Sequence, residues 1–142
     1  MARNMLDAML DIDPAGVETY TANYRELDRR LDSLDRQVAR TLRGAPRSFA
    51  VWHPSLSYFA RDYGLDQLSV GFENKEMPAR HLAQVTDSAR ARGVRVFFFQ
   101  KEYDSRQAEV LNRQMGTRLV TVDPLAADFD DELVRVASEL AK

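Results

Sequence analysis

Residues 49–59 read Phe-Ala-Val-Trp-His-Pro-Ser-Leu-Ser-Tyr-Phe, an apolar strand pattern that ends in a histidine and a proline. Residues 119–126, Leu-Val-Thr-Val-Asp-Pro-Leu-Ala, repeat the arrangement with an aspartate before the proline. If both strands are parallel members of one sheet, His53 and Asp123 leave it at the same edge. Open α/β sheets bind ligands outside the carboxyl ends of their strands. The two stretches therefore predict a parallel α/β fold with His53 and Asp123 at its ligand-binding edge.

Strand-like and helix-like segments alternate through the rest of this region. Strands are expected at residues 48–52, 67–72, 94–99 and 118–122, and helices at about 55–63, 78–92, 104–115 and 129–141. The strand segments are rich in Val, Phe and Leu and carry few charges, as strands buried on both faces do. The alternation predicts a four-stranded parallel sheet with helices on both faces. A chain that winds in both directions from its first strand gives the strand order 2-1-3-4.

Before this region, residues 14–43 are expected to form one long helix. Asp13 suits the N-cap and Pro14 the first helical position, while residues 44–46 (Gly-Ala-Pro) end the helix. Its apolar residues recur at spacings of three and four: Val17, Tyr20, Tyr24, Leu27, Leu31, Leu34 and Val38. This narrow seam predicts docking on the rest of the protein, with a coiled-coil partner as the alternative. A short helix is expected before it, starting at residue 1.

The composition is that of a globular protein the size of one domain. The chain has 142 residues, of which 44% are hydrophobic and 30% are charged. Its formal net charge of -2 leaves no basic field that would attract nucleic acid or an anionic membrane surface. Because the chain has no cysteine, thiolate metal sites, disulfides and cysteine nucleophiles are excluded. Its six glycines form neither a dinucleotide-binding fingerprint nor a Walker motif.

His53 and Asp123 are the candidate metal ligands. Zinc binds imidazole nitrogen and carboxylate oxygen, and a protein zinc site needs three or four such ligands. The other histidine, His81, lies near the start of an expected helix, and nothing in its spacing directs it to the same edge. Gln100 or Glu102, after the third strand, are candidates to orient a metal-bound histidine through a hydrogen bond. The alternative interpretation is structural: His53 bonds to backbone, and Asp123 caps a turn.

An enzyme is not expected. A Ser-His-Asp triad could be assembled from Ser55 or Ser57 with His53 and Asp123. However, the nucleophile of a hydrolase normally lies on a glycine-flanked turn, and residues 54–56 (Pro-Ser-Leu) provide none. The residues therefore favour a binding protein over a catalyst.

Three motifs, in this order, point to a family. They are residues 49–65 (FAVWHPSLSYFARDYGL), residues 73–82 (ENKEMPARHL) and residues 121–126 (TVDPLA). Together they resemble the C-terminal lobe of ZnuA/TroA-like metal-binding solute-binding proteins of ABC importers. The resemblance implies that the histidine of the His-Pro-x-x-x-Tyr-Phe motif, His53, is a metal ligand. It also implies that Asp123, which begins the Asp-Pro-Leu motif, is a ligand as in some family members.

Two further histidine ligands of that family come from an N-terminal lobe, and the second lies in an Asp-Pro-His-x-Trp motif. Residues 1–10 resemble the helix after that motif, so the chain is expected to begin downstream of it. The resemblance thus implies part of a periplasmic or extracytoplasmic receptor that hands zinc or manganese to an ABC permease. Residues 1–43 would be a linking helix region and residues 44–142 the C-terminal metal-binding lobe. Without the missing N-terminal lobe, the metal site would be incomplete and would bind its ion weakly.

The alternative, from a different functional class, is a free-standing α/β interaction module that self-associates through its long helix. A homodimer is also an expectation for the receptor lobe, because Met1, Met5 and Met9 of its first helix would be exposed. Metal binding at His53 distinguishes a receptor lobe from such a module.

Overall fold

The computed structural model describes residues 2–71, 78–103 and 105–142. The chain divides into two compact units, Met1–Val38 and Ala39–Lys142. The expected functional boundary between residues 43 and 44 stays a prediction. Within the described ranges, no helix combines the length and the apolar character needed to cross a membrane.

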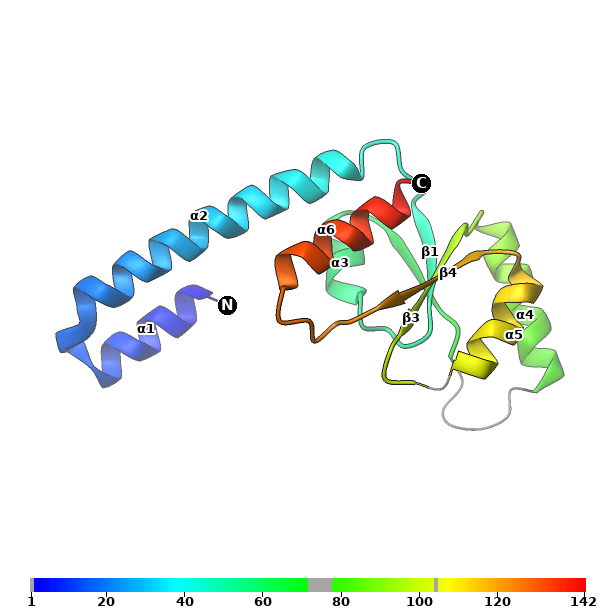
Figure 1. Cartoon of the computed structure of the whole chain (residues 1–142), viewed down its shortest axis with the longest axis horizontal. Helices are drawn as coiled ribbons and strands as arrows, with labels where there is room; N and C mark the ends of the chain where they lie inside the picture. The colour runs from blue at the N-terminus through cyan, green and yellow to red at the C-terminus, as the bar shows by residue number, and fades with distance from the viewer. Residues whose placement is uncertain (1, 72–77, 104) are drawn as a thin grey trace. The chain divides into compact units, whose positions relative to one another are not determined.

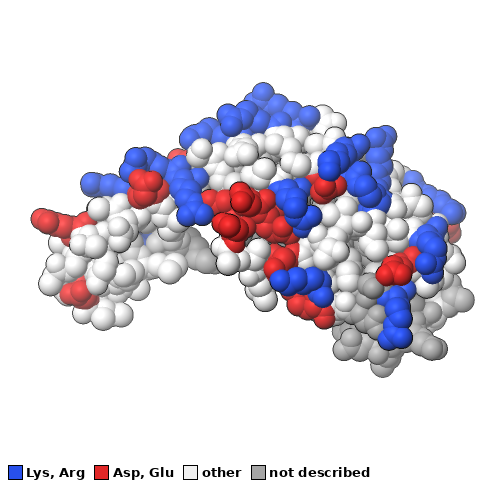
Figure 2. Space-filling view, in the orientation of Figure 1, with Lys and Arg blue, Asp and Glu red and all other residues white. Residues whose placement is uncertain are grey.

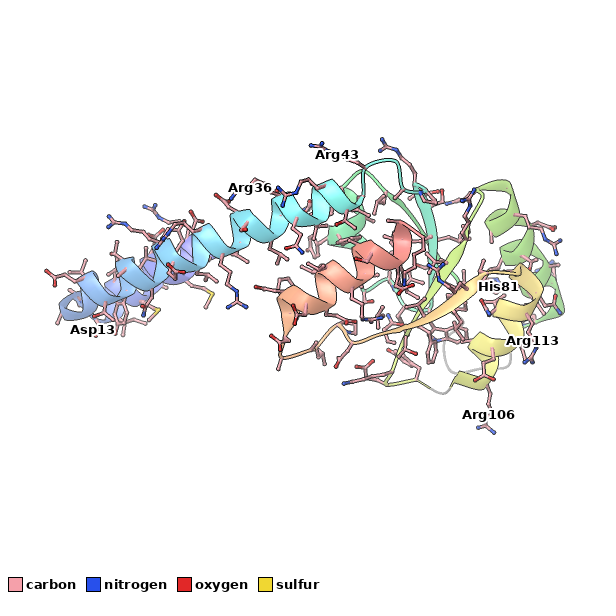
Figure 3. All side chains as sticks on the ribbon, turned by 45° about the horizontal axis from the view of Figure 1, so that its top comes forward. Asp13, Arg36, Arg43, His81, Arg106 and Arg113 are labelled. Atoms are coloured by element: carbon pink, nitrogen blue, oxygen red, sulfur yellow. The ribbon has the colours of Figure 1, made fainter. Side chains whose placement is uncertain are left out.

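The first unit contains the helix α1 (Ala2–Ile12), the 3-10 turn η1 (Pro14–Gly16) and most of the long helix α2 (Val17–Thr41). The long helix expected from residue 14 therefore begins with a separate turn. Asp13 does not cap it through its side chain, contrary to expectation. Instead, the Asp13 carboxylate accepts a hydrogen bond from the Tyr20 hydroxyl at 2.7 Å, and this bond raises the pKa of Tyr20. Asp13 is labelled at this end of the helix in Figure 3.

Apolar side chains of α1 and α2 line a shallow pocket of about 160 Å³ inside this unit. The lining residues are Ala2, Met5, Leu6, Met9, Tyr20, Asn23, Tyr24 and Leu27. The first half of the predicted seam on α2 thus faces α1. Met5 remains 62% exposed and Met9 44% exposed, so α1 leaves part of its apolar surface open to solvent.

The second unit is an α/β sheet structure (Figure 1). Its strands are β1 (Ser48–Val51), β2 (Asp66–Ser69), β3 (Val96–Gln100) and β4 (Arg118–Val122). Its helices are α3 (Ser57–Asp62), α4 (Ala79–Ala91), α5 (Ser105–Met115) and α6 (Phe129–Leu140). All strand pairs are parallel and the order is β2-β1-β3-β4, which confirms the predicted sheet and its topology. Helices α4 and α5 cover one face, and α3 and α6 lie on the other (Figure 1).

The central strand β3 is buried along its whole length because both faces of the sheet are covered. Phe97 packs 6.3 Å from Trp52 on the face that α4 and α5 cover, and Phe98 packs 5.7 Å from Phe49 in an edge-to-face arrangement. These aromatic pairs join β3 to β1 on both faces. The packing fixes the carboxyl ends of the strands, where the candidate ligands follow.

Charged residues of both signs cover the surface. Figure 2 shows acidic and basic side chains interspersed over the visible face of the molecule. Ion pairs such as Arg92 with Asp66 and Lys142 with Glu139 join neighbouring charges of opposite sign. This arrangement agrees with the small net charge of the sequence.

Candidate metal centre

His53 is held at the carboxyl end of β1 by a buried glutamine. The side chain of Gln100, only 2% exposed, donates to the His53 carbonyl oxygen at 2.9 Å and accepts from the His53 backbone N–H at 3.3 Å. The same amide donates to the Ser55 hydroxyl at 2.7 Å. Gln100 therefore fixes the main chain of the histidine and leaves both ring nitrogens out of this interaction. Gln100 does not play the expected role of bonding to the imidazole; it holds the main chain of His53 instead.

The His53 ring is oriented by an aromatic neighbour. It stacks on the ring of Tyr103, with 4.8 Å between the centroids and 28° between the planes. Both rings line a pocket of about 420 Å³ to which Pro54, Glu102 and Leu125 also contribute. His53 itself is exposed, so its ring is accessible to an ion from solvent.

Asp123 lies one residue beyond β4, and both of its carboxylate oxygens are engaged. Oδ2 forms an ion pair with Lys101, and Oδ1 accepts a hydrogen bond from the Leu125 N–H at 3.1 Å. The Asp123 N–H donates to Glu132 at 2.8 Å. The hydrogen bond from Lys101 is the main cause that lowers the pKa of Asp123, and the same contact raises the pKa of Lys101. The carboxylate is therefore held ionised, as a metal ligand must be.

The two candidate ligands lie at the same edge of the sheet, as predicted, on strands separated by β3. They do not line one pocket. His53 lines the pocket described above, and Asp123 lines a second pocket of about 300 Å³ between α3 and α6. Ser55 and Pro124 line both pockets, so the two pockets adjoin at these residues.

The described residues form only part of a metal site. In the described ranges, no three His, Asp or Glu side chains gather closely enough to hold an ion. His81 lies on α4 and is not among the residues that line the His53 pocket. The charged loop 73–77, which belongs to the second sequence motif, lies outside the described residues. The donor types fit a transition metal, but they supply fewer ligands than a protein zinc site uses.

Sequence reasoning weighed Gln100 and Glu102 after the third strand but gave no role to Lys101 and Tyr103. Both follow β3, whose carboxyl end lies between those of β1 and β4. Their position directly after the central strand was the available signal, because residues there can reach both neighbours. The strand pattern alone did not indicate that Lys101 would turn to Asp123 and Tyr103 to His53.

Comparison with known families decides the assignment. The family model for ZnuA, described as the periplasmic component A of a zinc-uptake complex, matches residues 1–137. The chain belongs to the ZnuA family. This confirms the resemblance found in the sequence motifs. The ZnuA family consists of solute-binding proteins and is not enzymatic, and its periplasmic location is the one expected.

Individual ZnuA relatives match nearly the whole chain. The zinc-binding protein AdcA of Streptococcus pyogenes serotype M3 is 25% identical over 136 residues, which are 94% of this chain and 26% of AdcA. The high-affinity zinc uptake system protein ZnuA of Bacillus subtilis is 26% identical over 136 residues, 92% of this chain and 43% of that protein. A crystal structure of ZnuA superposes with a TM-score of 0.87 at 31% identity, covering 96% of this chain and 54% of the other. The chain thus spans about a quarter to a half of the length of these relatives.

Proposed function

We propose that this chain is the C-terminal lobe, with the linking helix, of an extracytoplasmic receptor that captures a divalent transition metal for an ABC importer. Residues 1–43 form the linking helix region and residues 44–142 the metal-binding lobe. The observation that supports the proposal most strongly is His53, held exposed at the carboxyl edge of the sheet in a chain of the ZnuA family. The metal is the cargo, which the receptor passes to the membrane permease.

The lobe contributes half of the metal site under this proposal. His53 supplies an imidazole nitrogen and Asp123 a carboxylate, while the other ligands come from an N-terminal lobe that faces the same edge. With only two protein ligands, water must fill the remaining positions around the ion. The lobe alone should therefore bind metal much more weakly than a three- or four-ligand site.

Zinc is the better supported cargo, and manganese is the second. Imidazole nitrogen favours zinc and the softer divalent metals, whereas carboxylate oxygen also suits manganese. The relatives AdcA and ZnuA are described as a zinc-binding protein and a zinc uptake protein. Both arguments point to zinc for a site that contains His53.

A zinc titration followed by NMR of the histidine rings tests this function. The chain has two histidines, His53 and His81, so each ring can be observed separately. We expect the His53 resonances to shift with saturable, weak, one-to-one binding, and the His81 resonances to move little. Magnesium, which prefers oxygen ligands, is the control cation and should leave both rings unchanged. Zinc shifts confined to His81, or equal at both rings, would contradict the proposed site.

The interaction-module alternative is supported by a different observation, the exposed apolar surface of α1 and the start of α2. Met5, Met9, Ile12 and Val17 are all between 44% and 85% exposed. Apolar patches of this kind commonly mark contacts with another chain, and a second copy is the simplest partner. We expect sedimentation equilibrium to show a concentration-dependent dimer, which Met5→Lys with Met9→Lys weakens. A dimer that forms without any zinc binding at His53 favours the module, and a monomer at all concentrations removes it.

A further inference from the structure

Lys101 is held opposite Asp123 by the register of the central strands. Gln100, the last residue of β3, pairs with Val122, the last residue of β4. The next residue, Lys101, continues the ladder because its N–H donates to the Val122 carbonyl at 3.2 Å. Its side chain then reaches the Asp123 Oδ2 atom. The ion pair is therefore a consequence of how β3 and β4 align.

Among the described residues, each carboxylate oxygen of Asp123 already has a partner. Oδ1 is occupied by the Leu125 N–H. Glu132, the neighbouring acid, accepts from the Asp123 N–H and from the Arg135 guanidinium at 2.6 and 2.8 Å. An ion that approaches from the His53 side thus meets a carboxylate that already has a cationic partner.

We infer that Lys101 is an internal counter-ion of Asp123, which a metal ion must displace before the aspartate can bind it. The inference rests on the proposed receptor function and adds a residue that sets its affinity. Lys101 is the cation that pairs with Asp123 in the absence of metal, and the arriving metal ion replaces it. Its ammonium group also repels a dication bound at His53. Both effects weaken metal binding and favour release of the cargo.

The exposure of the pair limits the size of the effect. The Lys101 side chain is 57% exposed and that of Asp123 is 25% exposed, so water and salt screen their attraction. Exposed ion pairs contribute little free energy. Breaking the Lys101–Asp123 pair should therefore change the affinity for the metal by roughly fivefold at most. Added to the loss of repulsion, this predicts that removal of the lysine charge tightens metal binding by about three- to tenfold.

Lys101→Met tests the inference because it removes the charge and keeps an unbranched apolar side chain. We expect calorimetric titration of the whole chain to show zinc binding about three- to tenfold tighter than in the wild type. Lys101→Arg, which keeps the charge, should bind zinc no more tightly than the wild type. Lys142→Met is the matched control, since Lys142 also pairs with a carboxylate, that of Glu139, but at the opposite end of α6 from Glu132. It should leave zinc affinity unchanged.

A comparison with and without Asp123 shows whether Lys101→Met acts by freeing the aspartate for the metal or only by removing a charge that repels the metal. In an Asp123→Asn background, Lys101→Met should still tighten zinc binding, because the repulsion is lost, but by clearly less than in the wild-type background. An equal gain with and without Asp123 would overturn the inference, and so would the absence of any gain in the single variant.

NMR of the Asp123 carboxyl carbon and of the Lys101 side chain separates this inference from the proposed function. We expect both to shift together with the His53 ring as zinc is added. Shifts at His53 alone would leave the receptor function standing and remove the role of Lys101. No shift at His53 would remove both.

Discussion

We expect Phe97→Ala to lower the free energy of unfolding by about 3–5 kcal/mol. The Phe97 side chain is 0% exposed and belongs to a buried cluster between the sheet and the helices α4 and α5. Its truncation removes a large apolar surface from the central strand and leaves a cavity beside Trp52, whose ring lies 6.3 Å away. Domains of this size are stable by only about 5–15 kcal/mol, so the loss is a large fraction of the total. Chemical denaturation followed by circular dichroism measures it.

Phe129→Ala is the matched control for this substitution. Phe129 begins α6 and is 51% exposed, so its truncation creates no closed cavity. We expect a loss below about 1 kcal/mol. Equal losses at Phe97 and Phe129 would show that the buried cluster does not carry the stability of the sheet.

The topology of the sheet could be predicted because its strands are buried on both faces. Continuous apolar runs such as residues 96–100 are typical of parallel strands, and the helices between them require crossover connections. The predicted strand ends were less accurate: the second strand starts at Asp66 instead of residue 67 and ends at Ser69 instead of residue 72. Hydrophobic pattern locates an element but does not fix where its last hydrogen bond forms.

The turn before α2 could not be predicted from capping preferences alone. Asp13 has the residue type and position of an N-cap, but its carboxylate bonds to the Tyr20 hydroxyl seven residues later. A nearby hydroxyl donor thus competes successfully with the backbone N–H groups of the helix start. Because that competition depends on side-chain conformations, local sequence rules do not reveal it.

The candidate site was predictable only at the level of strand ends. Strand-end reasoning places His53 and Asp123 at one edge because both follow parallel strands. The contacts that define the site join residues that are far apart in the sequence: Gln100 with the His53 backbone, Tyr103 with the His53 ring, and Lys101 with Asp123. These contacts depend on the register between non-consecutive strands, which the alternation of apolar residues does not encode.

We expect His53→Ala to weaken zinc binding by at least about 10- to 100-fold, because it removes the one imidazole at the carboxyl edge of β1. Loss of a residue that merely supports a metal ligand already costs this much. The substitution should leave the fold largely intact, since Gln100 bonds to the main chain of residue 53 and those hydrogen bonds survive. Only the stacking on Tyr103 is lost, which is worth about 0.5–1.5 kcal/mol.

The measurement is a calorimetric zinc titration of His53→Ala beside a His81→Ala control, with thermal denaturation of both variants. His81→Ala removes the other imidazole of the chain and should retain wild-type zinc affinity. Because the His53 backbone contacts persist in the alanine variant, a loss of affinity with little change in melting temperature can be assigned to the ring itself. Unchanged affinity in His53→Ala, or an equal loss in both variants, would show that zinc binds elsewhere and that the His53 edge is not the metal site.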